Sequence, residues 1–121
     1  MWRNKVYSFI GLAKKAGAVA AGENPAELAV KRGRACLVII AGDASHNTVK
    51  KFRTAVYGRN IPLVEFGSRE QLGHILGKPY YSVVAVTDRG FAERIKEMVD
   101  QNHNNDETAY GGGFFEQTKN S

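Results

Sequence analysis

The residues best suited to chemistry lie together in the segment Asp43-Ala44-Ser45-His46, which holds an acid, a hydroxyl group and an imidazole. These are the residue types of a hydrolytic triad, in which the histidine takes the proton of the serine and the acid orients the histidine. Neighbours on one short turn rarely reach that mutual geometry, and the glycine pair of a nucleophile elbow is missing. We therefore interpret Asp43 and Ser45 as caps, whose side-chain oxygens accept hydrogen bonds from the first N–H groups of the following helix.

The other residue types that hold metals or phosphate do not form a motif. No carboxylate or thiol stands at metal-ligand spacing from the histidines, which are His46, His74 and His103. Cys36 is the single cysteine, so we expect no disulfide and interpret it as a small buried residue in a reducing compartment. Neither G-x-x-x-x-G-K-[ST] nor G-x-G-x-x-G occurs. We expect no catalytic residue, no metal and no cofactor, and hence no enzyme.

Positive charge is the main compositional signal. The 121 residues include 17 Lys and Arg against 12 Asp and Glu, for a formal net charge of +5. A pI of about 9.5 favours an acidic partner such as a phosphate backbone, although cations at helix ends also arise from the helix dipole alone. The cations that could contact a backbone are Lys14, Lys15, Lys31, Arg32, Arg34, Lys50, Lys51, Arg53 and Lys78.

These residues must be positioned by alternating helices and strands. The run 36–41 is apolar at every position, which predicts a strand buried on both faces of a sheet. Further strands are expected at 18–21, 61–66 and 83–86, with helices at 3–16 and 24–33, between Ser45 and Gly58, at 68–76 and after Asp88. This order indicates an α/β protein, a three-layer α/β/α sandwich around a four-stranded mixed sheet.

The helix starts carry specific signals. Asn24 is expected to be the N-cap of the second helix, with Pro25 in the first helical position and Glu27 bonding back to the cap. Ser68 begins a similar capping pattern, and Thr87-Asp88 is expected to cap the last helix. A helix start at Gly22-Glu23-Asn24 could meet phosphate or a base edge, or could be an ordinary cap.

The chain is expected to form one domain, residues 1–102, followed by a disordered tail, residues 103–121. Beyond about residue 100 the sequence turns polar and loses its apolar period, so ordering it would not be repaid by burial. No uninterrupted apolar segment has secretory or membrane-spanning length. We therefore expect a soluble cytoplasmic monomer that does not bind membranes.

Several separated blocks of the sequence resemble the ribosomal protein seven-Ae family, and within it the bacterial members of the YlxQ type. The resemblance covers nearly everything except the tail, and the blocks occur in the family's order. It implies a three-layer sandwich that binds RNA kink-turns, which are sharp bends with tandem sheared G·A pairs, in the setting of the ribosome. The blocks are G-L-A-K-K-A-G (11–17), A-G-E-N (21–24), A-C-L-V-I-I-A-G-D-A-S-H-N-T-V-K-K (35–51), L-G-H-I-L-G-K (72–78) and V-A-V-T-D-R-G-F-A (84–92).

The resemblance also implies an RNA-binding face, made by the start of the second helix and the loop before the last strand. Gly22 and Asn24 match the family's G-x-N-E-x-x-K motif, whereas Pro25 and Leu28 replace its glutamate and lysine. In the loop, Tyr80 could pack on an extruded base. The candidate RNA-binding residues are Gly22, Glu23, Asn24, Lys14, Lys15, Lys31, Arg32, Lys78, Pro79 and Tyr80.

Two functions remain open at this point. The first is a small RNA-binding protein that recognises bent RNA through Asn24 and the loop near Lys78, while Lys14, Lys15 and Lys31 contact phosphates. The second is a protein-interaction module on the same fold, whose RNA-binding face has decayed. Loss of the family's glutamate and lysine would explain the second function, and the net positive charge favours the first.

Overall fold

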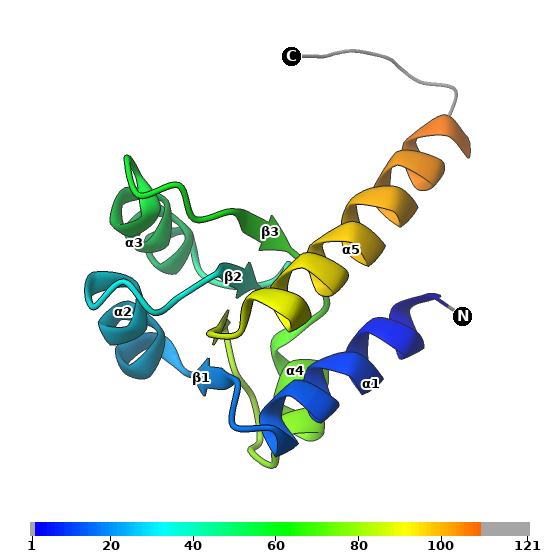
Figure 1. The fold of residues 1–121 in the computed structure, drawn as a ribbon. Coiled ribbons are helices and arrows are strands. Elements are labelled where there is room, and N and C mark those ends of the chain that lie inside the picture. Colours follow the sequence, from blue (N-terminus) through cyan, green and yellow to red (C-terminus); the bar gives the residue numbers. More distant parts are fainter. Residues whose placement is uncertain (1, 110–121) are drawn as a thin grey trace.

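In the part of the chain that the computed structural model describes, five helices alternate with four strands (Figure 1). The structure describes residues 2–109, with side chains described through residue 102. In chain order the elements are α1 Trp2–Lys15, β1 Val19–Ala21, α2 Glu23–Lys31, β2 Leu37–Ile40, α3 His46–Val56, β3 Leu63–Glu65, α4 Arg69–Leu76, β4 Val83–Val86 and α5 Arg89–Ala109.

The strands form one mixed sheet in the order β1-β4-β2-β3. Strand β4 pairs antiparallel with both β1 and β2, and β2 pairs parallel with β3. Pro62 directly precedes β3, an edge strand, where a missing N–H is tolerated. The ends of β1, β2 and β3 and the beginning of β4 therefore lie at the same end of the sheet, which we call the C-terminal edge.

Helices cover both faces of the sheet. Leu37 and Ile39 of β2 point into a core that α1, α4 and α5 close, while Val38 and Ile40 point into a second core beneath α2 and α3. All four side chains of β2 are buried, which is why the strand is apolar at every position rather than at alternate ones. The predicted three-layer α/β/α sandwich with a four-stranded mixed sheet is confirmed.

The start of α2 differs from its sequence-based prediction. The N-cap is Gly22 rather than Asn24, and the helix begins at Glu23. Pro25 is therefore the third helical residue, and the first intrahelical bond that we describe runs from Ala26 N to Gly22 O at 2.9 Å. Proline fits this position because the N–H groups of a first helical turn have no intrahelical acceptor, so the bond that proline lacks is not missed.

Asp43 caps a different helix from the one predicted. Ser45 caps α3 as expected, since its Oγ accepts from Thr48 N at 3.1 Å. Asp43 Oδ1 instead accepts from the backbone N–H of Arg69, the first residue of α4, at 2.8 Å. The parallel pairing of β2 and β3 brings the two loops together at the C-terminal edge, a contact that local sequence does not encode. Ser68 and Asp88 cap α4 and α5 as predicted.

The remaining expectations concern Cys36, the tail and membranes. Cys36 is only half-buried, packed against the first core just before β2. The expected domain boundary at residue 102 falls inside α5, and the predicted disorder beyond residue 109 lies outside the described residues. Within the described part of the chain, no helix combines the length and the apolar character needed to cross a membrane.

Candidate nucleic-acid interface

The pairing of β1 with β4 brings the start of α2 next to the loop that precedes β4. Ala21 is the register partner of Val84, and Gly22 N donates to Val83 O at 2.8 Å. The backbone of Gly22 has a φ of 102°, which favours glycine. A β-carbon at Gly22 would lie 3.5 Å from Cε1 of Tyr81, so the loop packs directly on this turn. The two segments of the predicted RNA-binding face are therefore adjacent.

The beginning of α2 is open to an external partner. Gly22 provides no side-chain cap, so no side chain of the N-cap competes for the first-turn N–H groups. Asn24 is exposed, and among the described side chains its amide makes no hydrogen bond or ion pair. Leu28, one turn further on, is 46% exposed and lies outside the cores. The residues at the family's three reading positions, Asn24, Pro25 and Leu28, thus all face solvent.

The loop 77–82 is held in place by α4. Gly77 ends the helix in the left-handed conformation with a φ of 84°, and Lys14 Nζ donates to Leu76 O at 2.8 Å. Tyr81 N donates to Arg69 O at 3.0 Å, and the Arg69 guanidinium stands 5.9 Å from the ring centroid of Tyr80. The Tyr80 side chain nevertheless remains 65% exposed. The loop presents an aromatic face beside the start of α2.

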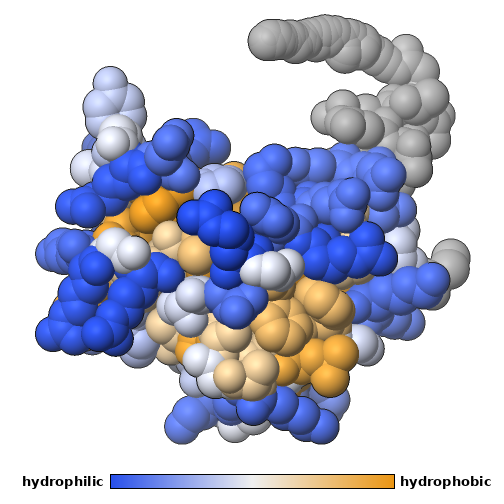
Figure 2. All heavy atoms as spheres, in the orientation of Figure 1, coloured by the Kyte–Doolittle hydropathy of each residue, from blue (hydrophilic) through white to orange (hydrophobic). Residues whose placement is uncertain are grey.

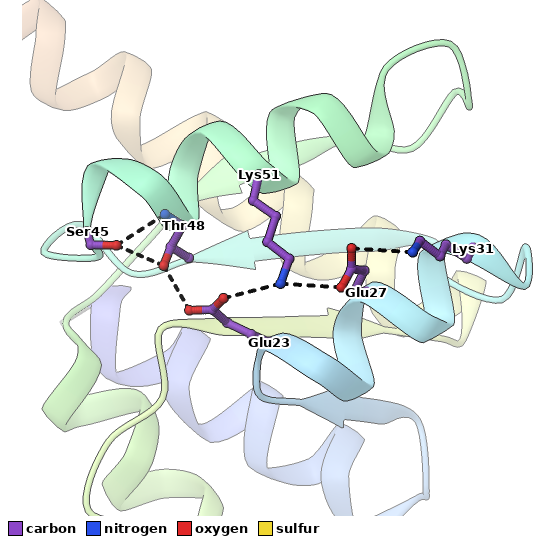
Figure 3. Close-up of polar contacts among 6 residues, drawn as sticks. All are labelled: Glu23, Glu27, Lys31, Ser45, Thr48 and Lys51. Atoms are coloured by element: carbon purple, nitrogen blue, oxygen red, sulfur yellow. Dashed lines mark hydrogen bonds and ion pairs between the residues drawn. The ribbon is translucent and has the colours of Figure 1, made fainter.

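Glu23 is committed to contacts within the protein. Figure 3 shows a chain of polar contacts between α2 and α3 in which Thr48 Oγ1 donates to Glu23 Oε2 at 2.8 Å. Lys51 Nζ lies 3.6 Å from Glu23 Oε1 and 3.3 Å from Glu27 Oε1. Lys31 Nζ is 3.6 Å from the other Glu27 oxygen. Glu23 therefore fastens α2 to α3, which leaves its carboxylate less available to an RNA base.

Two carboxyl groups near this edge have lowered pKa values. The pKa of Asp43 is lowered chiefly by the hydrogen bond from the backbone N–H of Arg69. The Arg69 guanidinium, whose Nε lies 3.6 Å from Asp43 Oδ2, lowers this pKa further. The pKa of Glu27 is lowered chiefly by the hydrogen bond from the Lys51 side chain. Both carboxylates accordingly have nearby compensating groups, so they oppose the binding of an anion less than free carboxylates would.

The structure brings together only part of the predicted set. Gly22, Glu23 and Asn24 lie beside the loop with Pro79 and Tyr80, and Lys14 contacts the end of α4 from which the loop begins. Lys31 and Arg32 lie at the other end of α2, about 14 Å along its axis from the N-cap. Lys15 ends α1 before β1 begins, and Lys78 is exposed in the loop. Within the described residues, no group of three or more His, Cys, Asp and Glu could hold a metal ion.

Three residues that shape the site were not predicted to do so. Asp43 and Arg69 join the loop after β2 to the start of α4, and Gly73 lets the loop pack against α4. Only Gly73 carries a usable sequence signal, because a glycine inside a predicted helix can mark a close approach of backbone.

Fold and site together define a small α/β/α domain that offers an open, partly basic edge with an exposed aromatic ring. The sequence profile of the ribosomal protein L7Ae/L30e/S12e/Gadd45 family matches residues 4–96. The chain belongs to this family, as its resemblance implied. The family's members are non-enzymatic, so the prediction that the chain is not an enzyme is confirmed.

Two curated relatives are both called RNA-binding protein YlxQ. The protein from Bacillus subtilis (strain 168) is 37% identical over 94 residues, which cover 78% of this chain and 94% of the relative. The protein from Enterococcus faecium is 34% identical over 98 residues, covering 81% and 94%. These relatives support the YlxQ type within the family.

Solved structures show the same fold. A protein of unknown function from Bacillus halodurans C superimposes with a TM-score of 0.76 and 34% identity, covering 79% of this chain and 97% of that one. The Giardia lamblia 15.5kD RNA binding protein gives a TM-score of 0.70 at 24% identity, covering 85% and 88%. At that identity the second comparison speaks for the fold alone.

Proposed function

We propose that this chain is a small RNA-binding protein that recognises kink-turn RNA as a monomer, in the cytoplasm and in association with the ribosome. The observation that carries the proposal is the hydrogen bond from Gly22 N to Val83 O, which places an uncapped helix start next to the loop that carries the exposed ring of Tyr80. Family membership and relatives named as RNA-binding proteins support RNA as the partner.

Each part of this face has a role that its chemistry suits. The Asn24 amide can donate to and accept from a base edge, and no protein contact among the described residues occupies it. Tyr80 can stack on an extruded base, as aromatic residues do in RNA recognition. Lys14, which donates to Leu76 O at the end of α4, and Lys78, which is exposed in the loop, can contact phosphates.

A protein-interaction module remains the second candidate because the reading positions are altered. Pro25 and Leu28 offer no hydrogen bond, and Glu23 is held by Thr48 and Lys51. A surface with fewer polar readers would suit contact with a protein better than discrimination of G·A pairs.

A gel-shift titration decides between the candidates. The probes are a standard kink-turn duplex and an unbent duplex of equal length and base composition, so that the phosphate contribution is matched. We expect tighter binding to the kink-turn at every salt concentration. Equal affinity for the two duplexes would reject kink-turn recognition, and no binding to either duplex would favour the protein-interaction module.

A further inference from the structure

A second basic surface lies between α2 and α3, away from the face proposed to read the kink-turn. It is a groove of about 620 Å³, which we call the α2/α3 groove. The residues that line it are Glu27, Lys31, Asn47, Lys50, Lys51, Thr54, Ala55, Tyr57 and Arg59. Four of them are cations and one is an acid, so the groove is strongly positive.

Two of the four cations in the groove are paired with a carboxylate of the described residues, and two are not. Glu27 pairs with Lys31 and Lys51, at 3.6 Å and 3.3 Å, and this acid is therefore neutralised locally. Lys50 and Arg59 are exposed and form no ion pair with any carboxylate among residues 2–102. These two cations are available to an external anion. Figure 2 shows hydrophilic residues over the outer parts of α2 and α3, with an apolar area between them.

Tyr57 stands at the far end of the groove. It is the C-cap of α3, and its side chain is 87% exposed, the highest value among the exposed large hydrophobic residues described. Its ring therefore contributes little to the core. Because Arg59 follows closely along the chain, the aromatic face and a free cation share one end of the groove.

The groove begins where the proposed RNA face ends. Helices α2 and α3 both begin at the C-terminal edge of the sheet, and the contact between Thr48 and Glu23 joins their first turns (Figure 3). The groove follows α3, which is about 16 Å long, away from that edge. An RNA bound at the start of α2 could thus continue along the groove.

We propose that the α2/α3 groove binds a single-stranded RNA segment that flanks the kink-turn, with Lys50 and Arg59 on its phosphates and a base stacked on Tyr57. A positive groove combined with an aromatic platform is the arrangement that binds single strands without sequence preference. An acidic protein segment fits less well, because the exposed ring of Tyr57, beside two cations that are unpaired among the described residues, offers a stacking surface for a base next to contacts for phosphates. The position of this segment beside a kink-turn rests on the proposed function, whereas the binding of a single strand in the groove takes from it only that the partner is RNA.

The test uses the full chain and four labelled RNA probes in fluorescence anisotropy titrations. The probes are a blunt kink-turn duplex, the same duplex with a short uridine extension at a 3′ end, the same duplex extended at a 5′ end, and oligouridine alone. The variants are Tyr57→Ala, Tyr57→Phe, Arg59→Ala and Arg53→Ala. Arg53 is the matched control, since it is an exposed arginine of α3 outside the groove.

We expect one extended probe to bind about tenfold more tightly than the blunt duplex. Tyr57→Ala and Arg59→Ala should remove this gain and leave the affinity for the blunt duplex unchanged, while Tyr57→Phe and Arg53→Ala should keep it. A thermal melt of each variant confirms folding. No gain with either extension, or an equal loss in Arg53→Ala and Arg59→Ala, would overturn the inference.

The oligouridine probe separates this inference from the proposed function. If the blunt kink-turn duplex binds no better than an unbent one, but oligouridine binds and Tyr57→Ala weakens that binding, the kink-turn proposal fails and the groove assignment stands. If oligouridine binding is the same in wild type and Tyr57→Ala, the groove assignment fails whatever the kink-turn result.

Discussion

Gly73 lies so close to Tyr80 that a β-carbon on Gly73 would stand 2.4 Å from the Tyr80 Cα atom and 2.6 Å from Lys78 O. These are backbone atoms of the loop, which cannot move aside as the end of a flexible side chain can. The absence of a side chain at position 73 therefore sets the position of the loop that presents Tyr80.

Gly73→Ala should displace the loop. We expect a loss of about 1–3 kcal/mol in the free energy of unfolding, as for other overpacking changes, together with weaker binding to a kink-turn duplex. Gly11→Ala is the control, because this helical β-carbon would meet only Ile75 Cγ2, at 3.4 Å. Chemical denaturation of both variants checks the prediction, and equal stabilities would contradict it.

Asn24→Ala should weaken kink-turn binding without destabilising the domain. A lost base-edge contact should cost about 1–3 kcal/mol of binding free energy, more than the loss of any single lysine among several phosphate contacts. Because the N-cap is Gly22, no helix cap is lost, and the melting temperature should stay unchanged. Calorimetric titration of Asn24→Ala beside Lys78→Ala tests this, and equal small losses would refute a reading role for Asn24.

Pro25→Glu combined with Leu28→Lys should strengthen kink-turn binding. The change restores the two missing family residues, and Leu28 is 46% exposed, so a lysine there keeps its charge in water. A glutamate in the first helical turn also suits the helix dipole. The measurement is a salt titration of kink-turn affinity. A folded double variant with wild-type affinity would mean that this helix start does not contact RNA.

The capping carboxylate of Asp43 should make stability depend on acid pH. Its pKa is lowered in the folded protein, chiefly by the Arg69 N–H, so folding is favoured by the ionised form. That stabilisation is complete above the usual pKa near 3.8 and is lost as the pH falls through the lower folded value.

Asp43→Asn should therefore be less stable than wild type at neutral pH, and the difference should shrink as the pH falls below 3.8. Urea denaturation across this pH range measures it. Glu93→Gln, at an exposed carboxylate of α5, serves as the control. A difference between wild type and Asp43→Asn that is constant with pH would show that charge does not matter at this cap.

The sequence predicted those parts of the fold that local patterns encode. The unbroken apolar run of β2 indicated burial on both faces, and Ser45 and Ser68 marked helix starts, because capping acts over three residues. The predicted start of α2 was wrong. Asn24 followed by Pro25 is a sequence pattern typical of an N-cap, whereas the observed N-cap, Gly22, is positioned by its neighbours Val83 and Tyr81 in another part of the chain.

The site was less predictable because it is assembled from distant segments. The link between Asp43 and Arg69 requires the parallel pairing of β2 with β3. The packing of Tyr81 beside Gly22 requires the antiparallel pairing of β1 with β4. Charge and residue type gave candidate cations, Lys31 and Arg32 among them, but they do not show which cations lie beside the start of α2.

The pairing of Val19–Ala21 with Val84–Val86 also has a consequence for the order in which the protein forms. Strands β2 and β3 are close along the chain, whereas β1 must wait until β4 has been synthesised. Contacts between segments so far apart in the sequence are slow to form. The junction of Gly22 with Tyr81 depends on this last pairing. A nascent chain that still lacks β4 therefore cannot yet bring the start of α2 next to the loop that precedes β4.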